Sequence, residues 1–124
     1  MKRRAIAWFV VPVLLIAGAT AGDASQVVQI ALHGRYFSEP ANVRILVAVE
    51  PDENNRSLRI EADGTDMFRA SEMALEGSRE KRLHTFTFKN LSAGYYTLRA
   101  QVLSSDAVRG TATSEVVVTG AGLR

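Results

Sequence analysis

The sequence predicts an all-β domain, an antiparallel β-sandwich of about seven strands preceded by a cleaved signal peptide. Apolar and polar residues alternate along six segments, which is the period of half-buried strands. Turn-forming residues separate these segments. The first 21 of the 124 residues have the charge and hydropathy of a secretory leader. We therefore expect a signal peptide over residues 1–21, a β-sandwich over 22–119 and a flexible tail over 120–124.

The leader has the three parts of a signal peptide in the expected order. Basic residues occupy positions 2–4, an apolar run covers 5–17, and Ala19 and Ala21 provide the small residues of a cleavage site. An uncleaved membrane anchor is the alternative, but the run is shorter than the ~20 residues that a spanning helix needs. No later stretch is apolar enough to span a membrane. The mature chain is therefore expected to be periplasmic or extracellular.

The charge balance of the mature chain argues against a nucleic-acid partner. Three of the 15 basic residues lie in the leader, which leaves 12 against 13 acidic residues. A domain without net positive charge lacks the attraction to phosphates on which such binding depends. The chain has no cysteine, which excludes disulfides, thiolate nucleophiles and cysteine-ligated metals. Its stability must come from an ordinary hydrophobic core.

Each alternating segment places one apolar face toward a common core. The segments cover residues 26–32, 42–49, 57–62, 82–90, 96–102 and 108–119. The inward side chains expected in the fourth and the last segment are His84, Phe86, Phe88, Val108, Ala112, Val116 and Val118. Strands at this spacing, with no strong helix between most of them, are typical of a sandwich.

The segment from Met67 to Leu75 fits two structures. Its alanine, glutamate and methionine residues favour a helix. It also fits a strand that crosses from one sheet to the other and turns Met73 and Leu75 inward. The all-β context favours the strand, and we expect a strand here.

One stretch resembles a known group of domains. Phe86 to Ala100 contains a strand that ends in an apolar residue, then Ser-Ala-Gly, then an aromatic pair that opens the next strand. This pattern resembles bacterial immunoglobulin-like and fibronectin type III-like secreted modules of unassigned function. The resemblance covers residues 43–118 and implies an immunoglobulin-like β-sandwich. The disulfide and core tryptophan of antibody domains are both absent, so an antibody-type domain is not expected.

The resemblance also assigns structural roles. It places Tyr96 where these folds have a "tyrosine corner", with the ring in the core and the hydroxyl bonded to the backbone of the turn. Strand alternation adds Phe86, Phe88 and Leu98 as structural residues that face the core. This motif specifies a fold, and it leaves the function open because the architecture hosts many activities.

The candidate binding residues are exposed aromatic side chains. Tyr36 and Phe37 lie in the loop between the first two strands, beside Arg35. Tyr95 points outward if Tyr96 points inward. Aromatic residues with arginine are favoured anchors of protein interfaces. Stacking on sugar rings would need two or three exposed rings in line, and the sequence does not show whether these three share a surface.

No pattern indicates catalysis or a metal site. His33 and His84 have no nearby ligand pattern, and His84 is expected to be partly buried with a satisfied hydrogen bond. The acidic loops at Asp52 and Asp63 could suggest weak calcium binding, but they lack the ligand spacing of an EF-hand and read as turns. No serine lies in a nucleophile elbow. We therefore expect no enzyme activity, cofactor or metal.

Three functions follow, in order of preference. The first is a secreted, non-catalytic module that binds an envelope or extracellular protein or supports envelope assembly. The second is a carbohydrate-binding module, which shares the fold and the exposed aromatics. A small metal-dependent enzyme comes last.

Overall fold

The computed structural model of the chain describes residues 27–120. The predicted signal peptide (1–21) lies outside the described residues, as does all but the first residue of the predicted tail. Within 27–120 no helix is long and apolar enough to cross a membrane.

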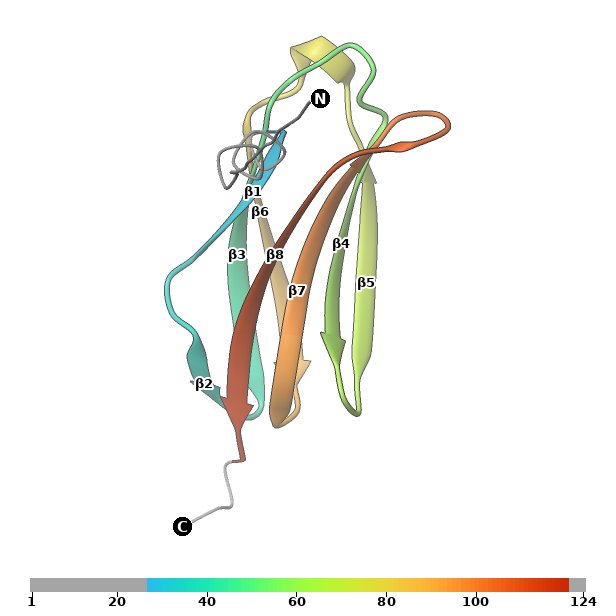
Figure 1. Cartoon of the computed structure of the whole chain (residues 1–124). Coiled ribbons are helices and arrows are strands. Elements are labelled where there is room, and N and C mark those ends of the chain that lie inside the picture. Colours follow the sequence, from blue (N-terminus) through green and yellow to red (C-terminus); the bar gives the residue numbers. More distant parts are fainter. Residues whose placement is uncertain (1–26, 121–124) are drawn as a thin grey trace, which may run out of the picture.

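The described chain consists of eight β-strands and one short 3₁₀ helix, η2 (Figure 1). The elements are β1 (Val28–Leu32), β2 (Tyr36–Ser38), β3 (Ala41–Val49), β4 (Ser57–Gly64), β5 (Phe68–Ala74), η2 (Gly77–Arg79), β6 (Leu83–Leu91), β7 (Gly94–Leu103) and β8 (Val108–Thr119). The all-β prediction is confirmed, and the sequence segments match β1, β3, β4, β6, β7 and β8.

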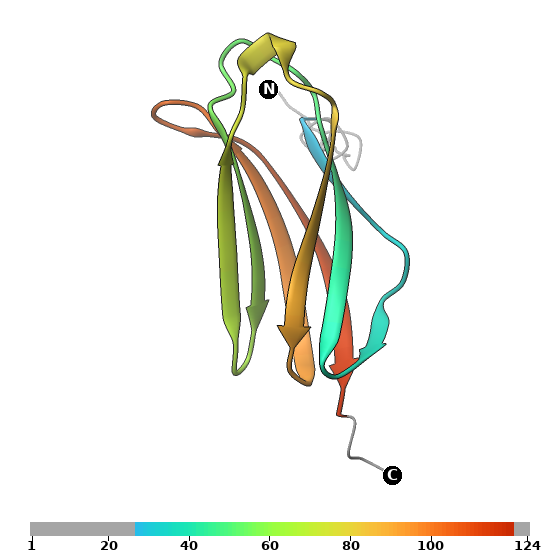
Figure 2. The ribbon, with the colours of Figure 1, turned by 180° about the vertical axis from the view of Figure 1, so that it is seen from behind.

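The strands form two sheets that face each other, as the front and rear views show (Figures 1 and 2). One sheet has three strands in the order β1-β3-β6, and the other has five in the order β2-β8-β7-β4-β5. Neighbouring strands run antiparallel, except that β2 runs parallel to the end of β8. The chain crosses between the sheets several times. Side chains from both sheets form one hydrophobic core.

The core lies between the sheets and follows the predicted alternation. The β3 side chains alternate strictly between buried and more exposed positions, because one face of the strand meets the core and the other meets solvent. The largest fully buried side chains are Ile45, Leu58, Ile60, Leu91, Leu98, Val28, Val43, Val47, Val49, Val102, Val116 and Val118. Phe88 is buried as well, and Phe86 packs edge-to-face on it with the ring centroids 4.8 Å apart.

The structure corrects the expected inward position of Val108. This side chain is 51% exposed. The pairing of β7 with β8 shifts between Val102 and Leu103, so that Val108 pairs with Leu103. A bulge of one residue turns the strand over, and Val108 therefore shares the outer face with Leu103.

Residues 68–74 form a strand and not a helix, but this strand does not cross between the sheets. β5 pairs with β4 along its whole length and is the edge of the five-stranded sheet. Met73 packs against the core and Leu75 is buried. The crossing comes later, where η2 leads the chain to β6 (Figure 2).

Tyr96 joins the core to the turn between β6 and β7. Its side chain is 3% exposed, and its hydroxyl donates a hydrogen bond of 2.7 Å to the carbonyl oxygen of Ser92. This is the geometry of a tyrosine corner. Gly64 lies under the ring, where an added Cβ would come within 2.6 Å of Tyr96 Cε2. A glycine is therefore required where β4 ends.

Candidate functional site

Two exposed tyrosines lie in one row on the outer face of the five-stranded sheet. Tyr36 on β2 and Tyr95 on β7 both pair with Val117 on β8, which lies between them. Paired residues in a sheet project from the same face. Tyr36 is 78% exposed and Tyr95 is 75% exposed, whereas Val117 is half-buried. We call Tyr36, Val117 and Tyr95 the tyrosine row.

The tyrosine row has a defined spacing. The two tyrosines are separated by one strand, which places their Cα atoms about 10 Å apart, twice the usual distance between neighbouring strands. The row lies at the end of the sandwich where β8 ends and β7 begins (Figure 1). The sheet therefore presents two large, amphipathic side chains with an apolar valine between them.

Phe37 does not belong to this surface. It pairs with Val118, whose side chain is buried, and it packs against the core. Tyr36 and Phe37 point in opposite directions because successive residues of a strand project from opposite faces. The structure thus brings together two of the three predicted binding residues and places the third with the core.

Backbone and side-chain hydrogen bonds fix Tyr36 on the sheet. The amide of Val117 donates to the carbonyl of Arg35 over 2.7 Å, and the amide of Glu39 donates to the carbonyl of Thr119 over 2.9 Å. The Arg35 guanidinium donates to the carbonyl of Glu115 over 2.9 Å. Arg35 therefore anchors β2 to β8 at the border of the tyrosine row.

A second contact holds the turn beside Tyr95. The amide of Ala93 donates to the Glu39 carboxylate over 2.7 Å. This bond links the loop after β2 to the turn before β7. Together with the Tyr96 corner, it fixes the backbone on both sides of the tyrosine row.

Phe68 is an exposed aromatic residue that sequence reasoning missed. It is 53% exposed and pairs with Asp63, which pairs in turn with Thr97. Phe68 therefore lies on the same outer face as the tyrosines, at the edge strand β5. Its segment was ambiguous between helix and strand, and the face of Phe68 could not be assigned until that ambiguity was resolved.

A network of ion pairs covers the middle of this face. The Glu61 carboxylate accepts hydrogen bonds from Arg59 Nε over 2.6 Å and from Arg99 over 2.5 Å, and Glu61 is 12% exposed. The bond from Arg59 lowers the pKa of Glu61, burial of the carboxylate opposes this, and Arg99 lowers the pKa further. These bonds favour the charged form of the carboxylate, and the network is a polar cluster on the same face as the tyrosine row.

His84 is buried at 4% exposure, and its Nε2 atom has no hydrogen-bond partner among the described residues. Glu80 Oε2 lies 3.8 Å from Nε2, beyond hydrogen-bond distance. The other Glu80 oxygen accepts from the amide of Glu76 over 2.6 Å. The satisfied hydrogen bond expected for His84 is therefore not formed at Nε2 within the described residues.

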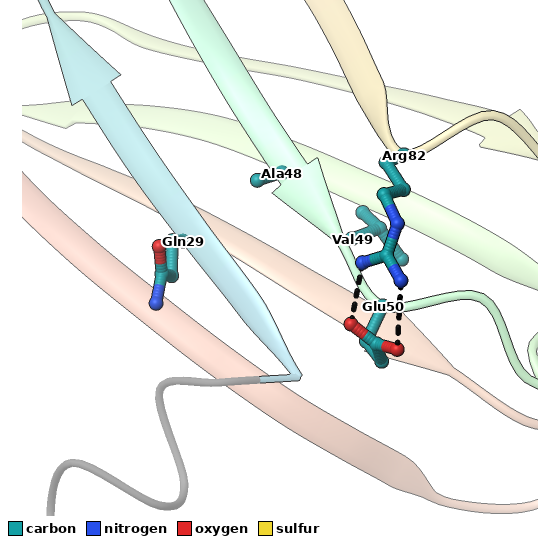
Figure 3. Close-up of a pocket in the computed structure, with 5 residues that line it drawn as sticks. All are labelled: Gln29, Ala48, Val49, Glu50 and Arg82. Atoms are coloured by element: carbon teal, nitrogen blue, oxygen red, sulfur yellow. Dashed lines mark hydrogen bonds and ion pairs between the residues drawn. The ribbon is translucent and has the colours of Figure 1, made fainter.

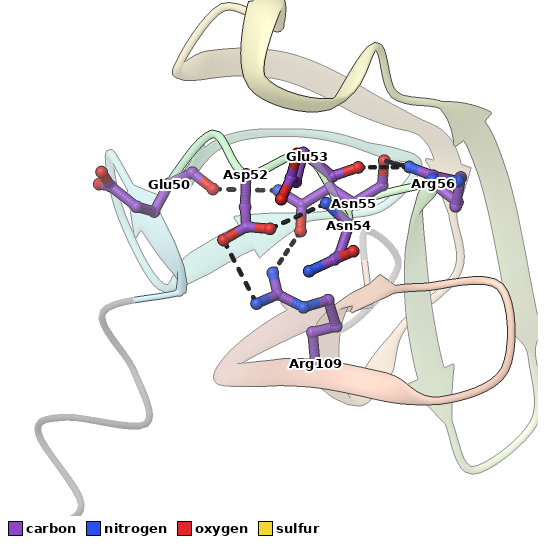
Figure 4. A network of polar contacts seen from close by, with 7 residues as sticks. All are labelled: Glu50, Asp52, Glu53, Asn54, Asn55, Arg56 and Arg109. Carbon is purple, nitrogen blue, oxygen red and sulfur yellow. Dashed lines mark hydrogen bonds and ion pairs between the residues drawn. The ribbon is translucent and has the colours of Figure 1, made fainter.

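The loop at Asp52 is closed by the protein's own donors (Figure 4). The Asp52 carboxylate accepts from the amide of Asn54 over 2.8 Å and pairs with Arg109 at 3.5 Å. The buried Asn55 side chain accepts from Arg109 over 2.6 Å and donates to the carbonyl of Glu50 over 3.0 Å. This network fixes the loop between β3 and β4. Within residues 27–120, no group of three or more aspartate, glutamate or histidine residues could hold a metal ion.

Two hollows in the described surface lie away from the tyrosine row. One, of about 280 Å³, is lined by Gln29, Ala48, Val49, Glu50 and Arg82 (Figure 3). Arg82 and Glu50 close one side of it with two hydrogen bonds of 2.7 and 3.3 Å, and these raise the pKa of Arg82. The other hollow lies between β1 and β8.

Comparison with known proteins identifies the fold. No protein-family model and no curated protein matches the sequence. Among solved structures, the CARDB domain of a Pyrococcus furiosus protein aligns with a TM-score of 0.51 and 17% identity, over 75% of this chain and 93% of that one. Red sea bream transglutaminase aligns with a TM-score of 0.51 and 14% identity, over 73% of this chain and 14% of that one. The fold is an immunoglobulin-like β-sandwich.

Proposed function

We propose that this chain is a secreted, non-catalytic immunoglobulin-like module that binds another protein through the tyrosine row. The observation that carries the proposal is the pairing of Tyr36 and Tyr95 on either side of Val117, with both rings exposed. Exposed apolar patches on a protein surface often mark interaction sites, and aromatic side chains are favoured anchors of such sites.

The surroundings of the row support a protein partner. An interface has an apolar centre with aromatic anchors and a polar rim. Val117 and the tyrosine rings form such a centre, and Arg35 and Glu115 lie at its border. The two described hollows lie elsewhere, so this surface suits a broad contact better than a small molecule. The proposed partner is an envelope or extracellular protein, since the signal peptide predicted over residues 1–21 would direct the chain out of the cytoplasm.

The test begins with crosslinking in the intact cells that produce the chain, using a C-terminal tag and mass spectrometry of the captured proteins. Binding of the identified partner is then measured with Tyr36→Ala and Tyr95→Ala. Each variant should weaken binding by about 30-fold, the effect of losing an anchor worth about 2 kcal/mol, with an unchanged melting temperature. Leu83→Ala is the control, because Leu83 is 54% exposed on the other sheet. Full affinity in both tyrosine variants would refute the proposal.

A carbohydrate ligand is the second candidate, and one observation favours it. The two tyrosines lie one strand apart on the same face of the sheet, and neighbouring exposed rings on one surface are what stacking on consecutive sugars requires. A glycan array of cell-wall and storage polysaccharides separates the two functions. Binding that is lost in Tyr36→Ala and Tyr95→Ala would favour the glycan, whereas a blank array would leave the protein partner.

A further inference from the structure

The edge of β8 carries backbone groups that no described strand uses. β2 pairs only with the last part of β8, at residues 117–119. The Val117 amide and the Thr119 carbonyl both bond toward β2. In a regular strand, alternate residues direct their backbone groups to the same side. Thr111 and Thr113 therefore direct their N–H and C=O groups away from β7, to the side that β2 does not reach.

The facing edge of β1 is unpaired in the same way. The Glu50 amide donates to the carbonyl of Val27, so odd-numbered residues of β1 bond toward β3. Ile30 therefore directs its backbone groups toward β8. Cα atoms of β1 and β8 approach within 8 Å, yet no backbone hydrogen bond joins the two strands within residues 27–120.

A hollow of about 430 Å³ lies between these two edges. It is lined by Gln29, Ile30, Thr111, Ala112 and Thr113. At one end of the hollow the chain before β1 packs closely against β8, because a Cβ added at Gly110 would lie 2.8 Å from the side chain of Val27. Thr111 and Thr113 are exposed, and Ile30 and Ala112 are half-buried. The half-buried Ile30 and Ala112 and the exposed threonines thus line the hollow, together with backbone groups that pair with no strand within residues 27–120.

Charged side chains protect parts of two other edges, those of β6 and β5. On β6, the outward carbonyl of Lys89 accepts a hydrogen bond of 2.9 Å from Arg69 on β5. The edge strand β5 also carries Glu72, which pairs with Arg59. Charged side chains of this kind keep other strands from adding to a sheet edge. Residues 110–114 of β8 (Gly-Thr-Ala-Thr-Ser) and β1 (Val-Gln-Ile-Ala-Leu) carry no charged side chain. On this edge of β8 the charged contact comes later, where Arg35 donates to the Ser114 hydroxyl over 3.4 Å and to the carbonyl of Glu115 over 2.9 Å.

We propose that the hollow between β1 and β8 binds an extended peptide segment of a partner protein, which adds to the edge of β8 as a β-strand. The unpaired backbone groups require an extended backbone, because only that conformation matches their spacing. The neutral walls suit an uncharged segment. Its inward residues would be small or apolar, above Ile30 and Ala112, and its outward residues would be polar, beside Thr111 and Thr113. This site is separate from the tyrosine row.

The test uses a nine-residue peptide of alternating threonine and valine with lysine at each end, and the purified full chain labelled with ¹⁵N. The amide resonances of Ile30, Thr111 and Thr113 should shift on titration. The same peptide with N-methyl groups on alternate residues should not bind, since it lacks the donors. Thr113→Pro should weaken binding about fivefold to tenfold, because one backbone donor is removed.

Two further results distinguish this site from the others. The double variant Tyr36→Ala and Tyr95→Ala should bind the peptide normally. The experiment therefore separates a failure of the proposed binding at the tyrosine row from a failure of the proposed peptide binding in the hollow. Shifts confined to the tyrosine row or β5, or equal binding of the N-methylated peptide, would overturn the proposal. Shifts of Thr111 and Thr113 with protein concentration alone would indicate pairing with a second copy, and would also overturn it.

Discussion

Tyr96 shows how one residue connects the sequence pattern to the fold. The Ser-Ala-Gly-Tyr-Tyr sequence places one tyrosine in the core and turns its neighbour outward. The Tyr96 hydroxyl reaches the carbonyl of Ser92, so the same turn that opens β7 also presents Tyr95. Strand alternation alone predicted the exposure of Tyr95, because the period of two is local and needs no knowledge of distant strands.

The corner hydrogen bond and the core should contribute differently to stability. Tyr96→Phe removes the bond to Ser92 and keeps the ring, so it should cost roughly 1 kcal/mol. Phe88→Ala leaves a cavity between the sheets and should cost roughly 3–5 kcal/mol. Unfolding in urea measures both. Similar small costs for the two variants would mean that Phe88 does not contribute to the core as described.

Glu61 predicts a specific loss of stability in acid. The Arg59 hydrogen bond, followed by that from Arg99, lowers the folded-state pKa of Glu61 below the ordinary value of 4.5. The unfolded chain therefore takes up the proton first as the pH falls. The stability that Glu61 contributes is complete above pH 4.5 and is lost as the pH falls through the lowered pKa.

A comparison of the native chain with the Glu61→Gln variant tests the direction of this pH dependence of stability. The variant should be less stable than the native chain at pH 7, and the difference should narrow as the pH is lowered below 4.5. Urea unfolding at several pH values measures it. A difference that stays constant from pH 7 to pH 3 would contradict the role of the ion pairs.

At the scale of elements, β8 has two different edges. Its pairing with β7 extends from Val108 to Val118, whereas on its other side β2 reaches only residues 117–119. The sequence did not predict β2, because its three residues lie in a turn-rich segment and their partner is about 80 positions away. Local alternation carries no information about such a parallel pair. The expectation that Phe37 is an exposed binding residue was wrong for the same reason, because the face from which it projects depends on the pairing of β2 with β8.

Proline substitutions in β8 should separate the two edges. Thr113 directs its amide away from β7, so Thr113→Pro should cost less than about 1 kcal/mol, as for other edge positions. Ser114 directs its amide toward β7, so Ser114→Pro should cost about 3 kcal/mol or more. Thermal and urea unfolding measure both. Equal costs would mean that the assignment of the backbone groups is wrong.

At the scale of the whole molecule, the sequence predicts the sandwich better than the site. The alternation of β3 and β7 identifies the core because burial on one face imposes it. The tyrosine row could not be predicted, since it requires β2, β8 and β7 to be neighbours in one sheet. The likeness to a CARDB domain at 17% identity concerns the fold, and the proposed binding role depends on the exposed residues of this chain.

Site-specific crosslinking in the producing cells tests the central claim most directly. A photoreactive phenylalanine analogue is placed at position 36, 95 or 83, and the adducts are identified by mass spectrometry. Positions 36 and 95 should capture the same partner protein, and position 83, which is exposed on the opposite sheet, should not. Capture of that partner from position 83 alone, or from none of the three positions, would contradict the assignment of the tyrosine row as the binding surface.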